Sequence, residues 1–152
     1  VRVMPNLAAE YGDVAAAIAK PVADETVRSM LADLGEVIEI DEAHMDLATA
    51  VNGSGPAFVF YFIQAMKRAA IDGGLEPEAA ERLVAQTFKG AAEMVVKSDR
   101  TADELIDAVC SPNGTTIEGM AVLRNSDLAD TIVESVVAAE HRAGEMRREL
   151  EL

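Results

Sequence analysis

The sequence predicts a mainly α-helical protein that begins with a short segment of mixed strand and helix. From Asp41 onward, apolar residues recur at helical spacing in each long segment. Before that residue, short apolar runs alternate with proline, asparagine and glycine, a pattern typical of strands and turns. We therefore divide the 152 residues into a segment 1–40 and a helical domain 41–152.

Residues 1–40 predict the order strand, strand, helix, strand. The runs "VRVM" and "AAAIAK" are short, apolar and bounded by Pro5, Gly12 and Pro21, as strands are. The run "DETVRSMLADLG" has a helical apolar face and stops at Gly35, and "EVIEI" follows as a strand. Three strands and one helix are too few for an α/β domain, so this segment is interpreted as the tail of one.

The rest of the chain predicts a series of helices. Pro77 suits a first helical turn, and Thr101 followed by Glu104 forms a capping box. The expected helices span residues 44–51, 56–72, 77–98 and 102–110, a stretch beginning at Thr115, and roughly 126–150.

Two of these helices are apolar over a broad surface. The run "FVFYFI" within 57–71 offers bulky groups on every side, and 128–146 adds a face of small and apolar residues. A helix that is apolar all round must be covered on all sides, which a domain of about 110 residues does with difficulty. A second copy of the chain is the expected cover, so the sequence predicts a homodimer.

Charge and composition exclude several classes of function. With 27 acidic and 13 basic residues the net charge is −14, which disfavours nucleic acid as a partner. No apolar run is long enough to predict a membrane span. His44 and His141 have no cysteine partners at zinc-like spacing, so we expect no metal site. The single Cys110 fits a reducing cytoplasm, where we expect the protein.

The stretch "CSPNGTTIEG" interrupts the helical region at residues 110–119. Pro112 ends the preceding helix, and Asn113 and Gly114 tolerate positive φ. Thr115 and Thr116 fall where the next helix starts, so backbone N–H groups there lack intrahelical acceptors. Such a turn is suited to bind a carboxylate or phosphate.

The stretch "NGSGPAF" has a similar design. Gly53 and Gly55 flank Ser54, which is predicted to cap the next helix, and Pro56 falls in its first turn. Each of the two stretches also has a purely structural interpretation as a turn between helices, with hydroxyl residues as caps. Their occurrence together in one small domain favours a binding site.

Three motifs in this order, "RVMPN", "ATAVNGSGPAFVF" and "AVCSPNGTTIEGMAVL", resemble the carboxy-terminal part of pyrroline-5-carboxylate reductase. The similarity covers essentially the whole chain. It implies a short remnant of a Rossmann-type domain followed by an all-helical dimerisation domain, of the type found at the carboxy terminus of 6-phosphogluconate dehydrogenase. It also implies reduction of 1-pyrroline-5-carboxylate to L-proline by hydride from NADPH or NADH, in a dimer or a ring of dimers.

The resemblance also assigns roles to individual residues. Thr116 matches a hydroxyl near the imine nitrogen and is the expected catalytic residue. The residues assigned to substrate binding are Ser111, Gly114, Thr115, Thr116, Ser54, Gly55 and Pro56. The residues assigned to the turn beside the nicotinamide are Met4, Pro5 and Asn6.

The sequence contains no G-x-G-x-x-G loop of the kind that binds a dinucleotide pyrophosphate. We therefore expect a chain that resembles the reductase without most of its cofactor domain, and that is inactive alone. Two alternatives remain open: a non-catalytic helical dimerisation module, and a related imine or hydroxyacid dehydrogenase with another substrate.

Overall fold

A computed structural model describes residues 1–22 and 24–150 of the chain. The chain forms two compact units. The first comprises residues 1–59 together with the described residues from 130 onward, and the second comprises residues 60–129. Each unit has its own internal packing.

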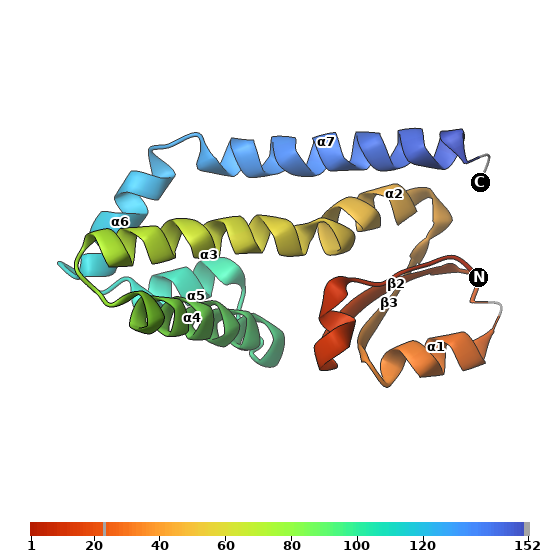
Figure 1. Ribbon diagram of the computed structural model, residues 1–152, viewed down its shortest axis with the longest axis horizontal. Helices are drawn as coiled ribbons and strands as arrows, with labels where there is room; N and C mark the ends of the chain where they lie inside the picture. Colours follow the sequence, from red (N-terminus) through yellow and green to blue (C-terminus); the bar gives the residue numbers. More distant parts are fainter. Residues whose placement is uncertain (23, 151–152) are drawn as a thin grey trace. The chain divides into compact units, whose positions relative to one another are not determined.

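The first unit contains a three-stranded sheet. Its strands are β1 (Val3–Met4), β2 (Val14–Lys20) and β3 (Gly35–Asp41), in the order β1-β2-β3. β1 runs antiparallel to β2, and β2 runs parallel to β3. Helix α1 (Glu25–Ala32) connects the parallel pair and packs on β2 and β3 (Figure 1). The predicted order of strand, strand, helix and strand is confirmed.

The centre of this sheet is its apolar core. Five of the seven residues of β2 are buried, on both faces of the strand. Ala17 and Ala19 pack against the buried Met45, and Ile18 points to the opposite face because side chains alternate along a strand. A strand covered on both faces accepts a continuous apolar run, which explains the composition of "VAAAIAK".

The segment predicted as one helix over 44–51 is three short pieces. A 3-10 turn, η2 (Glu42–His44), leads into α2 (Met45–Ala48) and then into a π-helical turn, η3 (Thr49–Gly53). Helix α3 (Gly55–Asp72) follows directly. Proline has no N–H, and its ring would clash with the carbonyl four residues earlier, so Pro56 explains the wider turn. A further 3-10 turn, η1 (Leu7–Tyr11), was also missed by the sequence analysis.

The final helix, α7 (Leu128–Glu149), is fixed to the first unit by an ion-pair cluster. The Asp46 carboxylate accepts hydrogen bonds from Arg2 at 3.0 Å and from Arg147 at 3.0 and 3.3 Å. Arg2 also pairs with Glu42 at 2.6 Å. Gly144 is buried, and a Cβ at this position would lie 3.3 Å from Asp46 Oδ2. The missing side chain therefore lets α7 approach Asp46 closely. The cluster therefore ties the carboxy-terminal end of α7 to α2 and to Arg2, the residue before β1.

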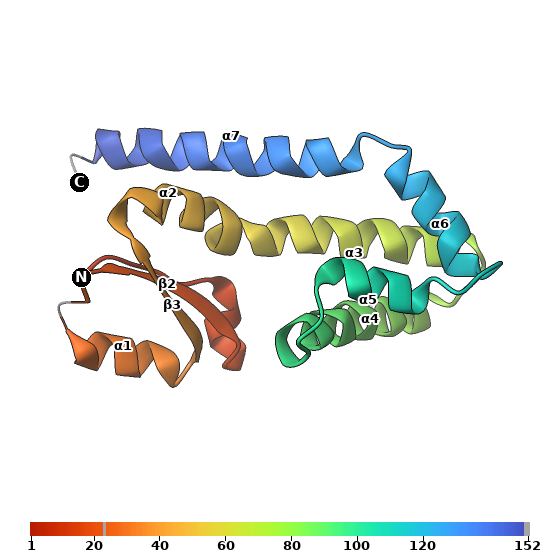
Figure 2. The ribbon, with the colours of Figure 1, turned by 180° about the vertical axis from the view of Figure 1, so that it is seen from behind.

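The second unit is entirely helical in the described residues. After the end of α3 it contains α4 (Pro77–Lys97), α5 (Ala102–Val109) and α6 (Thr115–Arg124). Pro77 opens α4, and Glu104 N–H donates to Thr101 Oγ1 while Thr101 N–H donates to the Glu104 carboxylate. Helices α4 and α5 lie side by side (Figure 2). The prediction of a mainly helical chain with a short strand-containing segment is confirmed.

Candidate functional site

The turn between α5 and α6 has the backbone geometry that the sequence predicts in part. Asn113 adopts a positive φ of 59°, the left-handed conformation that asparagine tolerates. Gly114 does not: it has φ −81° and ψ 164° and is the N-cap of α6. Its N–H donates to the Ser111 carbonyl at 2.9 Å, which closes the turn.

The need for glycine at position 114 comes from close packing rather than from its φ angle. A Cβ at this position would collide with Ser111 Oγ and lie 3.0 Å from the Ser111 carbonyl oxygen. The missing side chain therefore lets the Ser111 hydroxyl lie beside the first turn of α6. Tolerance of positive φ, the reason expected from the sequence, therefore does not explain Gly114.

The first turn of α6 presents backbone donors without acceptors. Thr115 and Thr116 are its first two residues, and no side chain caps the helix start. The first N–H groups of a helix have no intrahelical partner, and the positive end of the helix dipole lies there. Because the Gly114 N–H is already bonded within the turn, the donors that remain for an anion are those of the helix itself.

Side chains at this turn are accessible. Ser111 and Thr115 are exposed, and Thr116 is half-buried. Cys110, which ends α5, is a free and partly exposed thiol. The backbone amides of Thr115 and Thr116 and the Ser111 hydroxyl are suited to bind a carboxylate. The Thr116 side chain belongs to the same turn.

The predicted residues of the first unit lie around the end of β1. Asn6 accepts hydrogen bonds through Oδ1 from Ala8 N–H at 3.2 Å and from Ala15 N–H at 3.3 Å. It thereby caps η1, which starts at the next residue. Met4 is half-buried and Pro5 is exposed. The turn formed by Met4, Pro5 and Asn6 is thus fixed to the first residues of β2.

The predicted cap at Ser54 is wrong. This residue has φ −86° and ψ −26°, which is helical backbone, whereas an N-cap residue is extended. Its N–H donates to the Thr49 carbonyl at 3.0 Å as the last bond of the π-helical turn. Ser54, Gly55 and Pro56 therefore form a continuous passage from η3 into α3, and all three are half-buried.

Asn52 is the residue of this region that the sequence analysis did not assign to the site. Its side-chain amide donates to the Met4 carbonyl at 2.7 Å and to the Ala15 carbonyl at 2.8 Å. Among the described residues, its Oδ1 is a buried oxygen with no hydrogen-bond partner. An unpaired buried acceptor costs about 1–3 kcal/mol. A polar residue in a helical run was the available signal, but its partners are far away in sequence.

Gly53, next to Asn52, brings the π-helical turn close to β1. A Cβ at this glycine would collide with the terminal methyl of Met4. The turn at Met4–Asn6 and the turn at 52–56 are therefore in direct contact within the first unit.

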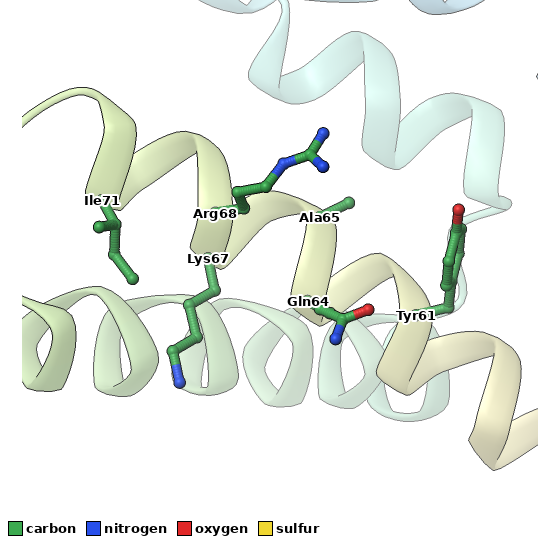
Figure 3. A pocket seen from close by; sticks show the side chains of 6 residues that line it. All are labelled: Tyr61, Gln64, Ala65, Lys67, Arg68 and Ile71. Atoms are coloured by element: carbon green, nitrogen blue, oxygen red, sulfur yellow. The ribbon is translucent and has the colours of Figure 1, made fainter.

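A groove of about 550 Å³ lies elsewhere, on the second unit (Figure 3). Its lining residues all belong to α3: Tyr61, Gln64, Ala65, Lys67, Arg68 and Ile71. Lys67 pairs with Glu81 of α4 at 2.6 Å. A groove lined by one helix is an open helix face, and it contains none of the predicted site residues.

Within residues 1–22 and 24–150, no three histidine, cysteine or acidic side chains gather where they could hold a metal ion. None of the helices in the described part is both long and apolar enough to cross a bilayer.

The sites lie in two units: Met4, Asn6 and residues 52–56 in the first, and residues 111–116 in the second. Comparison with known proteins shows the family to which the chain belongs. The family model described as pyrroline-5-carboxylate reductase dimerisation matches residues 42–146. A pyrroline-5-carboxylate reductase of Methanosarcina acetivorans is 37% identical over 96% of this chain and 56% of its own length. Pyrroline-5-carboxylate reductase 2 of Bacillus subtilis is 32% identical over 98% of this chain and 55% of its own length.

Solved structures give the same result. A pyrroline carboxylate reductase of Plasmodium falciparum, solved with NADP bound, matches with a TM-score of 0.84 and 34% identity over 95% of this chain and 61% of that one. A pyrroline-5-carboxylate reductase of Coxiella burnetii matches with a TM-score of 0.88 and 31% identity over 95% of this chain and 56% of that one. The chain spans about half the length of the curated relatives it matches. The predicted fold and the resemblance are confirmed, and the chain belongs to the pyrroline-5-carboxylate reductase family.

Proposed function

We propose that the protein carrying this chain reduces 1-pyrroline-5-carboxylate to L-proline, and that this chain supplies the substrate-binding and dimerisation part. The observation that carries the proposal is the uncapped start of α6 beside Ser111. It offers backbone donors and a hydroxyl to a carboxylate, which both the substrate and the product contain. Membership of the reductase family supports this assignment.

In this proposal the carboxylate accepts hydrogen bonds from the backbone N–H groups of Thr115 and Thr116 and from the Ser111 hydroxyl. Gly114 contributes by its small size, since its own N–H is bonded to Ser111. The Thr116 hydroxyl faces the imine nitrogen and steadies the ring. Ser54, Gly55 and Pro56 are also proposed as substrate-binding residues.

The reaction needs orientation more than acid–base machinery. A protonated imine is already an electrophile, and its carbon accepts a hydride while the nitrogen keeps its proton. Holding the substrate in a reactive orientation can lower the activation free energy by several kcal/mol. The largest such effects are about 7–11 kcal/mol. This explains how a site without a catalytic triad suffices.

A nicotinamide cofactor, NADPH or NADH, would supply the hydride when bound. The residues of the first unit fit its reactive end, because Asn52 Oδ1 is a buried acceptor without a partner in the described chain, beside Met4. A nicotinamide carries a carboxamide with donors of the kind that this oxygen lacks. Met4, Pro5 and Asn6 would line that end, and a pyrophosphate loop would have to come from outside residues 1–152.

The active site is proposed to be completed in a homodimer. Phe60 and Tyr61 of α3 are 58% and 72% exposed, and Val133 and Val137 of α7 are 61% and 56% exposed. Exposed apolar helix faces of this extent are typical of surfaces that a partner covers. The open groove along α3 is proposed to receive a helix of a second copy. The match to the dimerisation model supports the same assembly, which could extend to a ring of dimers.

The proposed domain division is 1–40 for the tail of the dinucleotide-binding domain and 41–152 for the helical domain. The family match begins at residue 42, next to this boundary. The parallel strands joined by α1 also support it, because such β-α-β units are the elements of Rossmann-type domains.

Two substitutions in the full-length protein test the proposed function. Thr116→Val keeps the backbone donors and removes the hydroxyl, so kcat should fall about 10- to 100-fold, as expected for one lost hydrogen bond in the transition state. Ser111→Ala should mainly raise KM for pyrroline-5-carboxylate, since the bond to the carboxylate is made equally in the ground and transition states. Wild-type kcat and KM in both variants would contradict the proposal and leave the turn at residues 111–116 with a purely structural role.

A further inference from the structure

The turn at Met4–Asn6 is held in an unusual way. β1 pairs with β2 only as far as Met4, which lies opposite Ala17. Pro5 follows and has no N–H with which to continue the ladder. Ala15 lies near the start of β2, beyond the point that β1 reaches, so β1 does not pair with its backbone.

Two asparagine side chains take the place of the missing ladder. The Ala15 N–H donates to Asn6 Oδ1 at 3.3 Å, and the Ala15 carbonyl accepts from the Asn52 amide at 2.8 Å. The second N–H of Asn52 donates to the Met4 carbonyl at 2.7 Å. One side chain thus joins the end of β1, the start of β2 and the turn that leads into α3.

The chemistry of Asn52 fits a role in positioning better than a role in packing. Only a side-chain amide can donate two N–H groups to two carbonyls from one position of this length. Its Oδ1 is left buried without a partner in the part of the chain described, an arrangement that an apolar residue of similar shape would avoid. The neighbouring Gly53 allows the close approach of Met4 that the two bonds require.

We propose that Asn52 is a positioning residue that ties the carbonyls of Met4 and Ala15 to the π-helical turn and so keeps the Met4–Asn6 turn and residues 54–56 in one fixed arrangement. The inference rests on the proposed function, in which the first of these segments lies on the cofactor side and the second on the substrate side. Asn52 holds these segments through its two amide N–H groups, and hydrogen exchange at Ala8 and Ala15 reports this role separately from a contact of its Oδ1 with a nicotinamide.

The test compares Asn52→Leu, Asn52→Ser and the control Thr49→Val in the full-length enzyme. Leucine keeps the approximate shape of the side chain and removes both donors, and serine keeps one donor. Thr49 is a matched control in the same π-helical turn, because its hydroxyl donates to the Met45 carbonyl at 2.9 Å, a bond within one helical turn. The first readout is hydrogen exchange of the backbone amides, and the second is steady-state kinetics.

In Asn52→Leu the amides of Ala8 and Ala15 should exchange about 10-fold faster or more, because the turn that carries Asn6 is released. kcat/KM for the nicotinamide cofactor should fall about 10-fold. KM for pyrroline-5-carboxylate should rise by a smaller factor, because residues 54–56 are released while residues 111–116 still hold the carboxylate. Asn52→Ser should lie between Asn52→Leu and the wild type. Thr49→Val should leave both readouts at wild-type values.

Unchanged exchange at Ala8 and Ala15 in Asn52→Leu would overturn the inference, and so would equal losses in Thr49→Val. If Asn52→Leu does not fold, Asn52→Ser decides by the same two criteria. A wild-type enzyme without reductase activity would contradict the proposed function, whereas the exchange measurement would still decide whether Asn52 holds the turn.

Discussion

Replacing Asp46 with asparagine removes the charge that two arginines share and keeps the shape of the side chain. Asp46 is 16% exposed, and its partners Arg2 and Arg147 are 36% and 38% exposed. Removing one member of a fully buried pair costs about 3–5 kcal/mol, and an exposed pair contributes about 0–1 kcal/mol. Because both arginines stay partly solvated, we expect a loss of about 1–2 kcal/mol in the free energy of unfolding at neutral pH. For a chain of this size that is a decrease of about 3–6 °C in Tm.

The pH dependence of this effect has a definite sign. Partial burial acts to raise the pKa of the Asp46 carboxyl, but hydrogen bonds from Arg147 and Arg2 and their charges outweigh it, so the pKa is lowered from its ordinary 3.8. A lowered folded pKa stabilises the folded state above the unfolded pKa, and this stability is lost as the pH falls through the folded value. The difference in the free energy of unfolding between wild type and Asp46→Asn should therefore be largest above about pH 5 and vanish in strong acid.

Urea unfolding at fixed protein concentration measures this difference, at neutral pH and at a series of acidic pH values. A double-mutant cycle with Arg147→Met isolates the contribution of that pair. Glu93→Gln is the control, because Glu93 pairs with Lys97 on the exposed surface of α4 and should contribute nothing measurable. Equal stability of Asp46→Asn and wild type at neutral pH, or a difference that persists in strong acid, would refute this account of how α7 is anchored.

Two further predictions concern association and cofactor binding. The exposed faces of 57–71 and 128–146 should pair across a two-fold axis and bury more than about 2,000 Å², so sedimentation should show a dimer at micromolar concentration. Val137→Asp should shift it toward the monomer, and a stable wild-type monomer would contradict the assembly. Residues 1–152 alone should give no saturable heat on calorimetric titration with NADPH, since they lack a G-x-G-x-x-G loop. Low-micromolar binding would show that the cofactor is held in another way.

Local sequence signals predicted most of the helices. Pro77 marks the start of α4, and the capping box at Thr101 marks the start of α5. The break at Pro112 and the left-handed Asn113 give the start of α6. Each of these features depends on residues within a few positions of one another, so the sequence contains the necessary information.

Features that depend on distant residues were not predicted. The π-helical turn arises where Pro56 meets a helix that is already fixed to the sheet, and periodicity alone does not distinguish it from an α-helix. Asn52 finds its acceptors 48 and 37 residues away, and Asp46 meets Arg147 across 101 residues. The role of Gly114 is also spatial, since it depends on the position of the Ser111 hydroxyl. These contacts require the tertiary structure.

The most direct test of the proposed function is to measure the products formed by the full-length protein from 1-pyrroline-5-carboxylate with NADPH or NADH. We expect one L-proline for each nicotinamide oxidised, with much slower turnover of other cyclic imines and of hydroxyacids offered with the oxidised cofactor. No proline with either nicotinamide, or faster reduction of another imine, would contradict the assignment of residues 111–116 as the site for this substrate.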